Sequence, residues 1–216
     1  MSKKAAIPLK NKAIAKKVVA KKAAVPKKKQ LTIMVSSTVF GAQSDLKQIC
    51  GILKGYGYKV VMSMEGTVYV PIGVSNEEAC LQAVQDCDLF LGIIFPRYGS
   101  GITHKEFSKA IDIDAPRWFI SHQYVTFARD ILKQYMFRGK RRNRQFKFKK
   151  TDIMDKADVI HMYNEAIQNH IASDKRRSHW AQPFFNSSDI FPFLKEQFGD
   201  MEKRVKELEA FKKKKK

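Results

Sequence analysis

The sequence predicts an α/β fold: a parallel sheet of four or five strands with helices on both faces, followed by a helical C-terminal elaboration. Between residues 31 and 138, short apolar runs alternate with segments whose apolar residues recur at helical spacing, as in strands joined by helices. The runs are apolar at nearly every position, which is typical of strands buried on both faces. A hydrophobic content of 44% and 15 Phe residues supply a core for a chain of 216 residues.

The first elements follow from local patterns. LTIMVSS, residues 31–37, is an apolar run that ends in two serines and suits a buried strand. A helix is expected to begin at residues 43–44 and to end at the sequence GYGY. YKVVMS, residues 58–63, predicts a second strand, and EGTVYVPIG predicts a loop after it. Ser75, with Glu78 three residues later, has the capping-box spacing that begins a second helix.

The next four elements continue the alternation. DLFLGIIF, residues 88–95, is the best candidate for a central strand, and a helix is expected over residues 103–112. PRWFISHQY, residues 116–124, predicts a fourth strand, and FARDILKQYMF, residues 127–137, predicts the helix after it. With four or five strands, an open sheet of flavodoxin-like (TIR-like) order is expected rather than a barrel.

The last third of the chain predicts a helical extension packed on this body. It begins with the basic loop RGKRRNRQFKFKK, residues 138–150, continues with a helix over 151–171 and ends with a helix that begins near Ile190. The chain is therefore divided into a disordered Lys/Ala-rich tail (1–30), the TIR-like α/β domain (31–138), the basic loop with the helical extension (139–211) and a poly-Lys tail (212–216).

The formal net charge of +20 comes mostly from the two ends of the chain. Residues 1–30 contain 11 Lys and no Asp or Glu, and residues 212–216 are all Lys, which leaves +4 for residues 31–211. A charge run is usually a solvated face, but this bias favours DNA or RNA binding through phosphate contacts. The basic loop predicts a further contact, with aromatic rings stacked on bases. The candidate nucleic-acid residues are Arg138, Lys140, Arg141, Arg142, Arg144, Phe146 and Phe148.

Several other classes of site lack sequence support. Cys50, Cys80 and Cys87 have no paired spacing, so reduced structural thiols are expected. Neither GxGxxG nor GxxxxGK[ST] occurs and the five His residues are scattered, so we expect no cofactor and no metal site. No apolar stretch approaches the length of a membrane span, and the N-terminus lacks the apolar segment of a secretory signal. A cytoplasmic protein without membrane contact is expected.

Ligands of open parallel sheets bind at the carboxyl ends of the strands, and this rule singles out two loops. Ser36, Ser37 and Thr38 follow the first strand, where their hydroxyl groups either contact a phosphate or ribose or cap the first helix. PRYGSGITHKE, residues 96–106, follows the central strand and ends in Glu106. By spacing alone, Glu106 is more readily explained as an acidic residue in the first turn of a helix than as a catalytic group.

Four motifs that follow one another along the chain favour a catalytic role for Glu106 over that of a helix-start charge. They are V-S-S-T at 35–38, C-x-x-A-V-x-x-C-D at 80–88, R-Y-G at 97–99 and T-x-x-E-F-x-x-A at 103–110. Together they span about 80 residues and resemble the pattern of the domain of unknown function 4062 family. The chain departs from that pattern at Lys105, where relatives often carry an acidic residue.

That family is similar to TIR domains and to nucleoside 2-deoxyribosyltransferases, in which a Glu at this position attacks or stabilises the anomeric carbon of an N-glycoside. The resemblance implies a nucleotide- or nucleoside-binding domain that cleaves or transfers an N-glycosidic bond, with NAD as the expected substrate and Glu106 as the catalytic carboxylate. It also implies a homo-oligomer, since TIR-like enzymes often assemble. The implied substrate-binding residues are Ser36, Ser37, Thr38, Arg97, Tyr98, Gly99 and Thr103.

Within this set the resemblance assigns Ser36 and Ser37 to the ribose or phosphate and Arg97 to a phosphate, and Tyr98 either stacks on a base or forms a wall of the pocket. A non-catalytic signalling or scaffold module in a defence-type pathway is the alternative that the same resemblance allows. In that case the cleft recognises a ligand or partner without turnover, and the basic tails bind nucleic acid.

Overall fold

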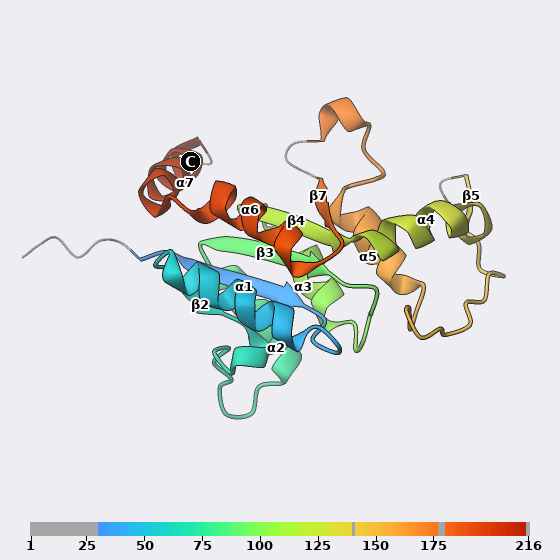
Figure 1. Cartoon of the computed structure of the whole chain (residues 1–216), viewed down its shortest axis with the longest axis horizontal. Helices are drawn as coiled ribbons and strands as arrows, with labels where there is room; N and C mark the ends of the chain where they lie inside the picture. Colours follow the sequence, from blue (N-terminus) through green and yellow to red (C-terminus); the bar gives the residue numbers. More distant parts are fainter. Residues whose placement is uncertain (1–29, 140, 177–179, 215–216) are drawn as a thin grey trace, which may run out of the picture.

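The computed structural model describes residues 30–139, 141–176 and 180–214 (Figure 1). The predicted disordered tail, apart from Gln30, therefore lies outside the described residues, as do Lys140 and the last two lysines. No helix in the described ranges is long and apolar enough to cross a membrane.

The predicted fold class is confirmed by a five-stranded sheet in which every neighbouring pair is parallel. The strands are β1 (Thr32–Ser37), β2 (Lys59–Val61), β3 (Leu89–Ile94), β4 (Arg117–His122) and β7 (Ala181–Phe184). Their spatial order is β2-β1-β3-β4-β7, which is the flavodoxin-like order because β7 is the fifth strand of the sheet in sequence. The first four strands occupy the four apolar runs predicted as strands.

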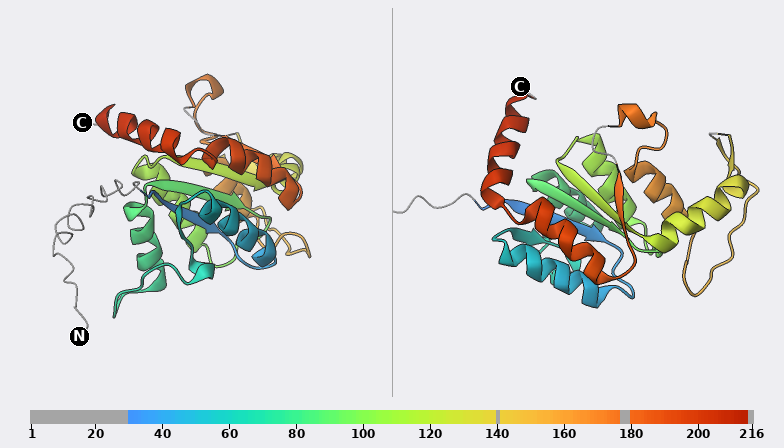
Figure 2. Two further views of the ribbon diagram at one scale, coloured as in Figure 1. Left: turned by 60° about the vertical axis from the view of Figure 1, so that its left-hand side comes forward. Right: turned by 45° about the horizontal axis from the view of Figure 1, so that its top comes forward.

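Helices cover both faces of the sheet (Figures 1 and 2). On one face, α1 (Gln43–Gly55) and α6 (Ser187–Phe198) lie side by side and share a core with alternate strand residues such as Leu91. The opposite face buries the intervening residues, including Phe90, under further helices. Those helices are α2 (Asn76–Asp86), α3 (Ile102–Asp112), α4 (Gln123–Met136) and α5 (Asp158–Ala166).

The C-terminal extension was predicted to be helical, but it also adds a strand to the sheet. Residues 181–184, expected within the extension, form the edge strand β7, and α6 packs on the sheet through Ile190, Leu194 and Phe198. The tetrapeptide Ala-Gln-Pro-Phe has neither an apolar run nor clean alternation. Its Pro183 is tolerated because an edge strand pairs on one side only.

Several predicted boundaries were wrong. The helix expected over 151–171 is shorter, because residues 151–157 form a loop and α5 covers only Asp158–Ala166. The final helix is two helices, since α6 ends at Phe198 and α7 (Met201–Lys214) turns off its end, as Figure 2 shows. The first three residues of the predicted poly-Lys tail therefore continue α7. The remaining short elements are β5 (Phe137–Arg138), β6 (Arg141–Arg142), η1 (Ser63–Glu65) and η2 (Ser173–Lys175).

Candidate functional site

A cleft of about 540 Å³ opens at the carboxyl end of the sheet, between β1 and β3. The chain leaves β1 for α1 on one face and leaves β3 for α3 on the other. This divergence is the topological switch point of an open sheet, where ligands commonly bind. The lining includes six of the eight residues predicted for catalysis and substrate binding: Ser36, Ser37, Thr38, Tyr98, Thr103 and Glu106.

Glu106 lies in the second turn of α3 and is only 4% exposed. The hydroxyl group of Ser36, at the end of β1, donates a hydrogen bond to its Oε2 atom. Burial raises the pKa of Glu106, because the ionised form loses water, while hydrogen bonds from Ser36 and Cys80 act in the opposite direction. The carboxyl group is therefore inside the cleft wall, not in solvent as a helix-start charge would be.

Cys80 and Ser63 also line the cleft and were not predicted as site residues. The Sγ atom of Cys80 lies 3.3 Å from the Oγ atom of Ser63, and its thiol also bonds the carboxylate of Glu106. Burial, with the nearby Glu106 charge, raises the pKa of Cys80 despite the bond to Ser63, so the thiol stays protonated and can donate. The only sequence signal for this role was the position of Cys80 at the start of the C-x-x-A motif.

The R-Y-G turn is fastened to the loop before α5. The backbone N–H groups of Tyr98 and Gly99 donate to the carboxylate of Asp155 at 2.7 and 3.0 Å. Lys156 donates from Nζ to the carbonyl oxygen of Gly99 at 2.9 Å. Burial alone would raise the pKa of Asp155, but its backbone hydrogen bonds, including those from Tyr98 and Gly99, lower it overall.

The side chain of Tyr98 is held at the cleft by a chain of polar contacts. Its hydroxyl group lies 2.9 Å from Nδ1 of His104, and Nε2 of His104 lies 2.8 Å from the Oε2 atom of Glu165. Ser108 donates to the other carboxylate oxygen at 2.5 Å. The bond to His104, followed by the bond from Ser108, lowers the pKa of Glu165 against the effect of burial. An ionised Glu165 orients the imidazole, which in turn orients the tyrosine.

Arg97 and Gly99 are the two predicted substrate residues that do not line the cleft. The guanidinium group of Arg97 donates to the carbonyl oxygen of Asp152 and lies 5.7 Å above the ring of Phe40. Its role in this structure is therefore to fasten the turn, not to meet a phosphate in the cleft. Gly99 has a φ of +63°, and a Cβ atom there would lie 3.2 Å from the side chain of Thr38, so it serves the shape of the turn.

The basic loop forms a short antiparallel ribbon, β5 and β6, beyond the end of α4. Its arginines at 138, 141, 142 and 144 are exposed. Phe146 and Phe148 are half-buried against the core instead of lying open for bases. Lys140 falls outside the described residues.

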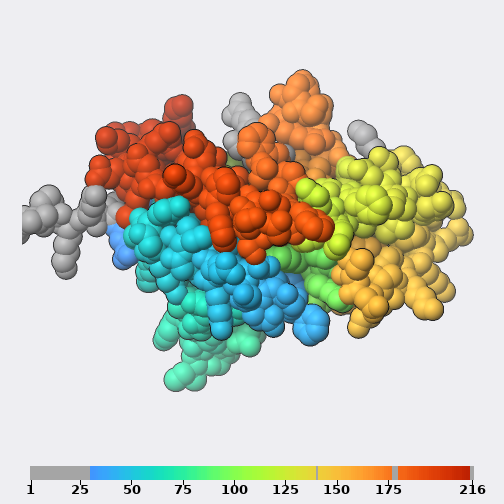
Figure 3. All heavy atoms as spheres, viewed as in Figure 1, coloured from blue at the N-terminus to red at the C-terminus, as the bar shows by residue number. Residues whose placement is uncertain are grey.

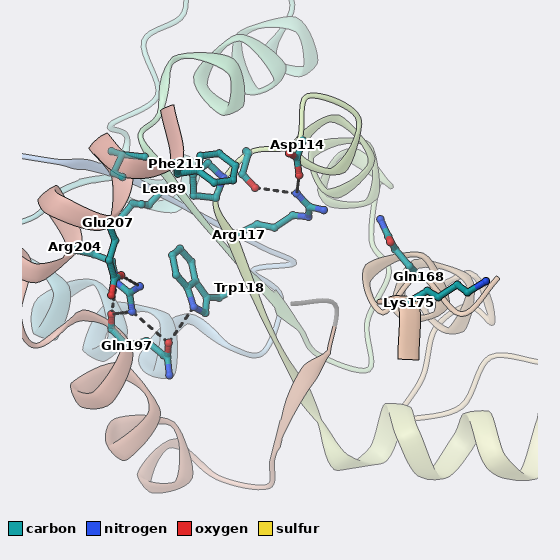
Figure 4. A pocket seen from close by; sticks show the side chains of 13 residues that line it. Leu89, Asp114, Arg117, Trp118, Gln168, Lys175, Gln197, Arg204, Glu207 and Phe211 are labelled. Atoms are coloured by element: carbon teal, nitrogen blue, oxygen red, sulfur yellow. Dashed lines mark hydrogen bonds and ion pairs between the residues drawn. The ribbon is translucent and has the colours of Figure 1, made fainter. Parts of the chain in front are cut away.

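A second pocket, of about 710 Å³, lies at the amino ends of β3 and β4 (Figure 4). Four of its charged groups are paired with one another: Arg117 lies 3.1 Å from Asp114, and Arg204 lies 2.5 Å from Glu207. We therefore place the site in the cleft at the carboxyl ends. Among the described residues, no three His, Cys, Asp or Glu side chains are arranged to hold a metal ion.

Fold and site together define an open, parallel α/β domain with a buried carboxyl group in a cleft at its switch point. Residues 32–178 match the family described as Domain of unknown function (DUF4062), and the chain belongs to that family, as its motifs had indicated. No curated protein matches the chain. A solved structure, of a conserved protein from Enterococcus faecalis V583, is similar at 12% identity and a TM-score of 0.38, over 78% of this chain and 99% of that one.

Proposed function

We propose that the cleft binds a nucleoside or nucleotide and that Glu106 cleaves or transfers its N-glycosidic bond. The observation that carries this proposal is the carboxyl group of Glu106, buried at the switch point and held by the hydroxyl group of Ser36. A carboxyl group placed there without a cation partner costs stability, and such groups cluster at functional sites.

The chemistry uses Glu106 in its ionised form. As the glycosidic C–N bond breaks, its electron pair leaves with the base and positive charge develops at the anomeric carbon. A purine or pyrimidine base takes up a proton from solvent, whereas nicotinamide, whose ring nitrogen is positively charged in NAD, leaves as a neutral molecule without a proton. The carboxylate stabilises that charge or forms a C–O bond with the carbon, and water or an acceptor base then takes the glycosyl group. Ser36 fixes one carboxylate oxygen, which limits the orientations that the carboxylate can adopt.

The lining of the cleft favours a sugar as the group that is bound deepest. Seven lining residues carry hydroxyl groups that can exchange hydrogen bonds with ribose: Ser36, Ser37, Thr38, Ser63, Tyr98, Ser100 and Thr103. NAD remains the substrate proposed from the family resemblance. Because Arg97 is engaged outside the cleft, we extend the proposal to uncharged nucleosides, whose binding needs no phosphate partner.

The decisive experiment measures base release from NAD, nicotinamide riboside and 2′-deoxynucleosides by chromatography. Glu106→Gln should reduce release at least about 100-fold, the cost of removing a group that acts on transition-state charge. Glu196→Gln, an exposed carboxyl group on α6, is the matched control and should behave as wild type. Failure of the wild type to release any base, or equal release by Glu106→Gln, would contradict the catalytic proposal.

A non-catalytic module is the second candidate, and the exposed arginines of the β5–β6 ribbon favour it. In this case the cleft recognises a nucleotide or partner while the basic regions bind nucleic acid. Saturable binding of a nucleoside, measured by ligand-observed NMR and without base release, would support this candidate over the first.

A further inference from the structure

Helix α4 carries two apolar stripes, and within the part of the chain that the structure describes only one of them packs in the core. Val125, Ala128, Leu132 and Met136 face inward and pack in the core under the sheet. Directly beside them in sequence, Tyr124, Phe127, Ile131 and Tyr135 repeat the same spacing of three, four and four residues on an outer face. Their exposed fractions are 40, 66, 48 and 54%. Single exposed apolar residues are ordinary, but a helical row of four needs an explanation.

Phe185 extends this row beyond the first turn of α4. Its ring lies 5.7 Å from the ring of Tyr124, and 51% of the residue is exposed. We call these five residues the α4 stripe: Tyr124, Phe127, Ile131, Tyr135 and Phe185. Figure 3 shows α4 on the outer surface of the molecule.

The area of the α4 stripe suits a weak pair of protein molecules. An aromatic side chain buries about 150–250 Å² when it is covered, so five roughly half-exposed large side chains offer about 500 Å² per copy. Two copies facing each other would bury about 1,000 Å², which is near the lower limit of a specific protein interface.

We propose that a second copy of this chain covers the α4 stripe, with the two α4 helices antiparallel about a two-fold axis. The row is self-complementary in that arrangement: an axis midway between Phe127 and Ile131 places each against the other in the partner copy. The same axis places Tyr124 against Tyr135. An isologous contact requires such reciprocal pairs, and the pairs are aromatic and aliphatic, as in the centres of protein interfaces.

Charges around the helix favour the antiparallel arrangement over the parallel one. Beside the stripe, Asp130 lies 3.2 Å from Lys133 and 3.5 Å from Arg129, so this flank of the helix carries only a small net positive charge. The basic β5–β6 ribbon begins directly after the last residue of α4. Antiparallel helices of 14 residues separate the two ribbons by about 20 Å, or two Debye lengths at 0.1 M salt, whereas parallel helices would place them together.

Sedimentation velocity of the full chain between about 5 and 300 µM tests the pairing. We expect a reversible monomer–dimer equilibrium that becomes stronger from 0.15 to 0.5 M NaCl, because salt screens repulsion between two chains of charge +20. Ile131→Asp should weaken dimerisation at least tenfold. Ile153→Asp is the control, since Ile153 is 51% exposed and lies outside the α4 stripe, and it should dimerise as wild type. Circular dichroism checks that both variants fold.

Two outcomes overturn the proposal: a wild type that stays monomeric at the highest concentration, or an Ile131→Asp variant that dimerises normally. Cysteine cross-linking tests the orientation. The Phe127→Cys and Ile131→Cys variants are mixed and oxidised. Antiparallel pairing predicts disulfides that join one variant to the other. Disulfides only between two copies of the same variant would exclude this arrangement. If Phe127→Ala, which changes no charge, instead weakens binding of a labelled oligonucleotide while the protein is monomeric, the stripe is a base-stacking surface and the proposal is wrong.

Discussion

Glu106 illustrates at the scale of one residue how a functional group differs from a stabilising one. Most buried carboxyl groups have a cationic partner that recovers the lost hydration. The hydrogen bonds to Glu106 come instead from the hydroxyl group of Ser36 and the thiol of Cys80, and burial still raises its pKa. The ionised state that the proposed chemistry needs is therefore the state that the fold disfavours.

A pH-dependent gain in stability follows for Glu106→Gln. Because the pKa of Glu106 is higher in the folded protein than in the unfolded chain, its favourable contribution is complete below the ordinary Glu pKa of about 4.3 and is lost as the pH rises through the folded pKa. The amide, which never ionises, should raise the free energy of unfolding at pH 8 by roughly 0.5–2 kcal/mol. This gain should disappear near pH 4.

Urea unfolding at both pH values measures this difference, with Glu196→Gln as the exposed control expected to change little. A Glu106→Gln protein that is less stable than wild type at pH 8 would show that the carboxylate is a net stabilising group. The assignment of Glu106 as a functional residue whose burial costs stability would then be wrong.

At the scale of an element, β3 connects the packing of the sheet to the position of the site. Gly92 lies at its centre, and a Cβ atom there would come within 2.6 Å of both Phe107 and Phe119. Phe107 directly follows Glu106 on α3, so its ring fixes how closely α3 approaches the sheet. The lack of a side chain at Gly92 therefore allows α3, and Glu106 with it, to lie close to the sheet at the cleft.

Gly92→Ala should therefore destabilise the protein by about 1–3 kcal/mol, the usual cost of overpacking a core. Gly51→Ala is the matched control, because Gly51 lies in α1 with open space around it and alanine favours a helix by about 0.5–1 kcal/mol. Chemical denaturation should give a lower free energy of unfolding than wild type for Gly92→Ala and a higher one for Gly51→Ala. A Gly92→Ala variant within about 0.5 kcal/mol of wild type would mean that the aromatic rings relax freely.

The elements also show which parts of the fold and site the sequence could predict. β1 and β3 are buried at nearly every position and leave continuous apolar runs, and the edge strand β2 still has two buried valines. β7 buries only Phe184 of its four residues and leaves no such signal. Ser36 and Glu106 were predictable because strand ends converge at one edge of a parallel sheet. The contact between His104 and Glu165 joins residues 61 positions apart, and the engagement of Arg97 by Asp152 spans 55. No local pattern encodes either contact.

At the scale of the whole molecule, most of the net positive charge lies outside the α/β domain. The two Lys-rich ends hold 16 of the 20 net charges, and they lie mostly outside the α/β domain. Electrostatic attraction to nucleic acid should therefore depend on the tail more than on the sheet, with the β5–β6 ribbon as a second contribution.

Removal of residues 1–30 should lower affinity for a labelled oligonucleotide at least about tenfold at 0.1 M salt and reduce the slope of log affinity against log salt, because 11 Lys are lost. Replacing Arg138, Arg141 and Arg144 with Gln should have a smaller effect of the same sign. Fluorescence anisotropy over a salt series measures both. Unchanged affinity and slope for the shortened chain would exclude the tail as a binding element.

The late position of β7 and α6 in the chain has a consequence for biosynthesis. β4 ends at His122 and its neighbour β7 begins only at Ala181, so the sheet closes through a contact of high sequence separation. While the ribosome is still making that segment, the edge of β4 is unpaired and the face later covered by α6 stays open to water. Such exposed edges and apolar faces attract chaperones and other nascent chains. Completion of the fold therefore waits until residues 181–198 have been made, long after the residues of the cleft.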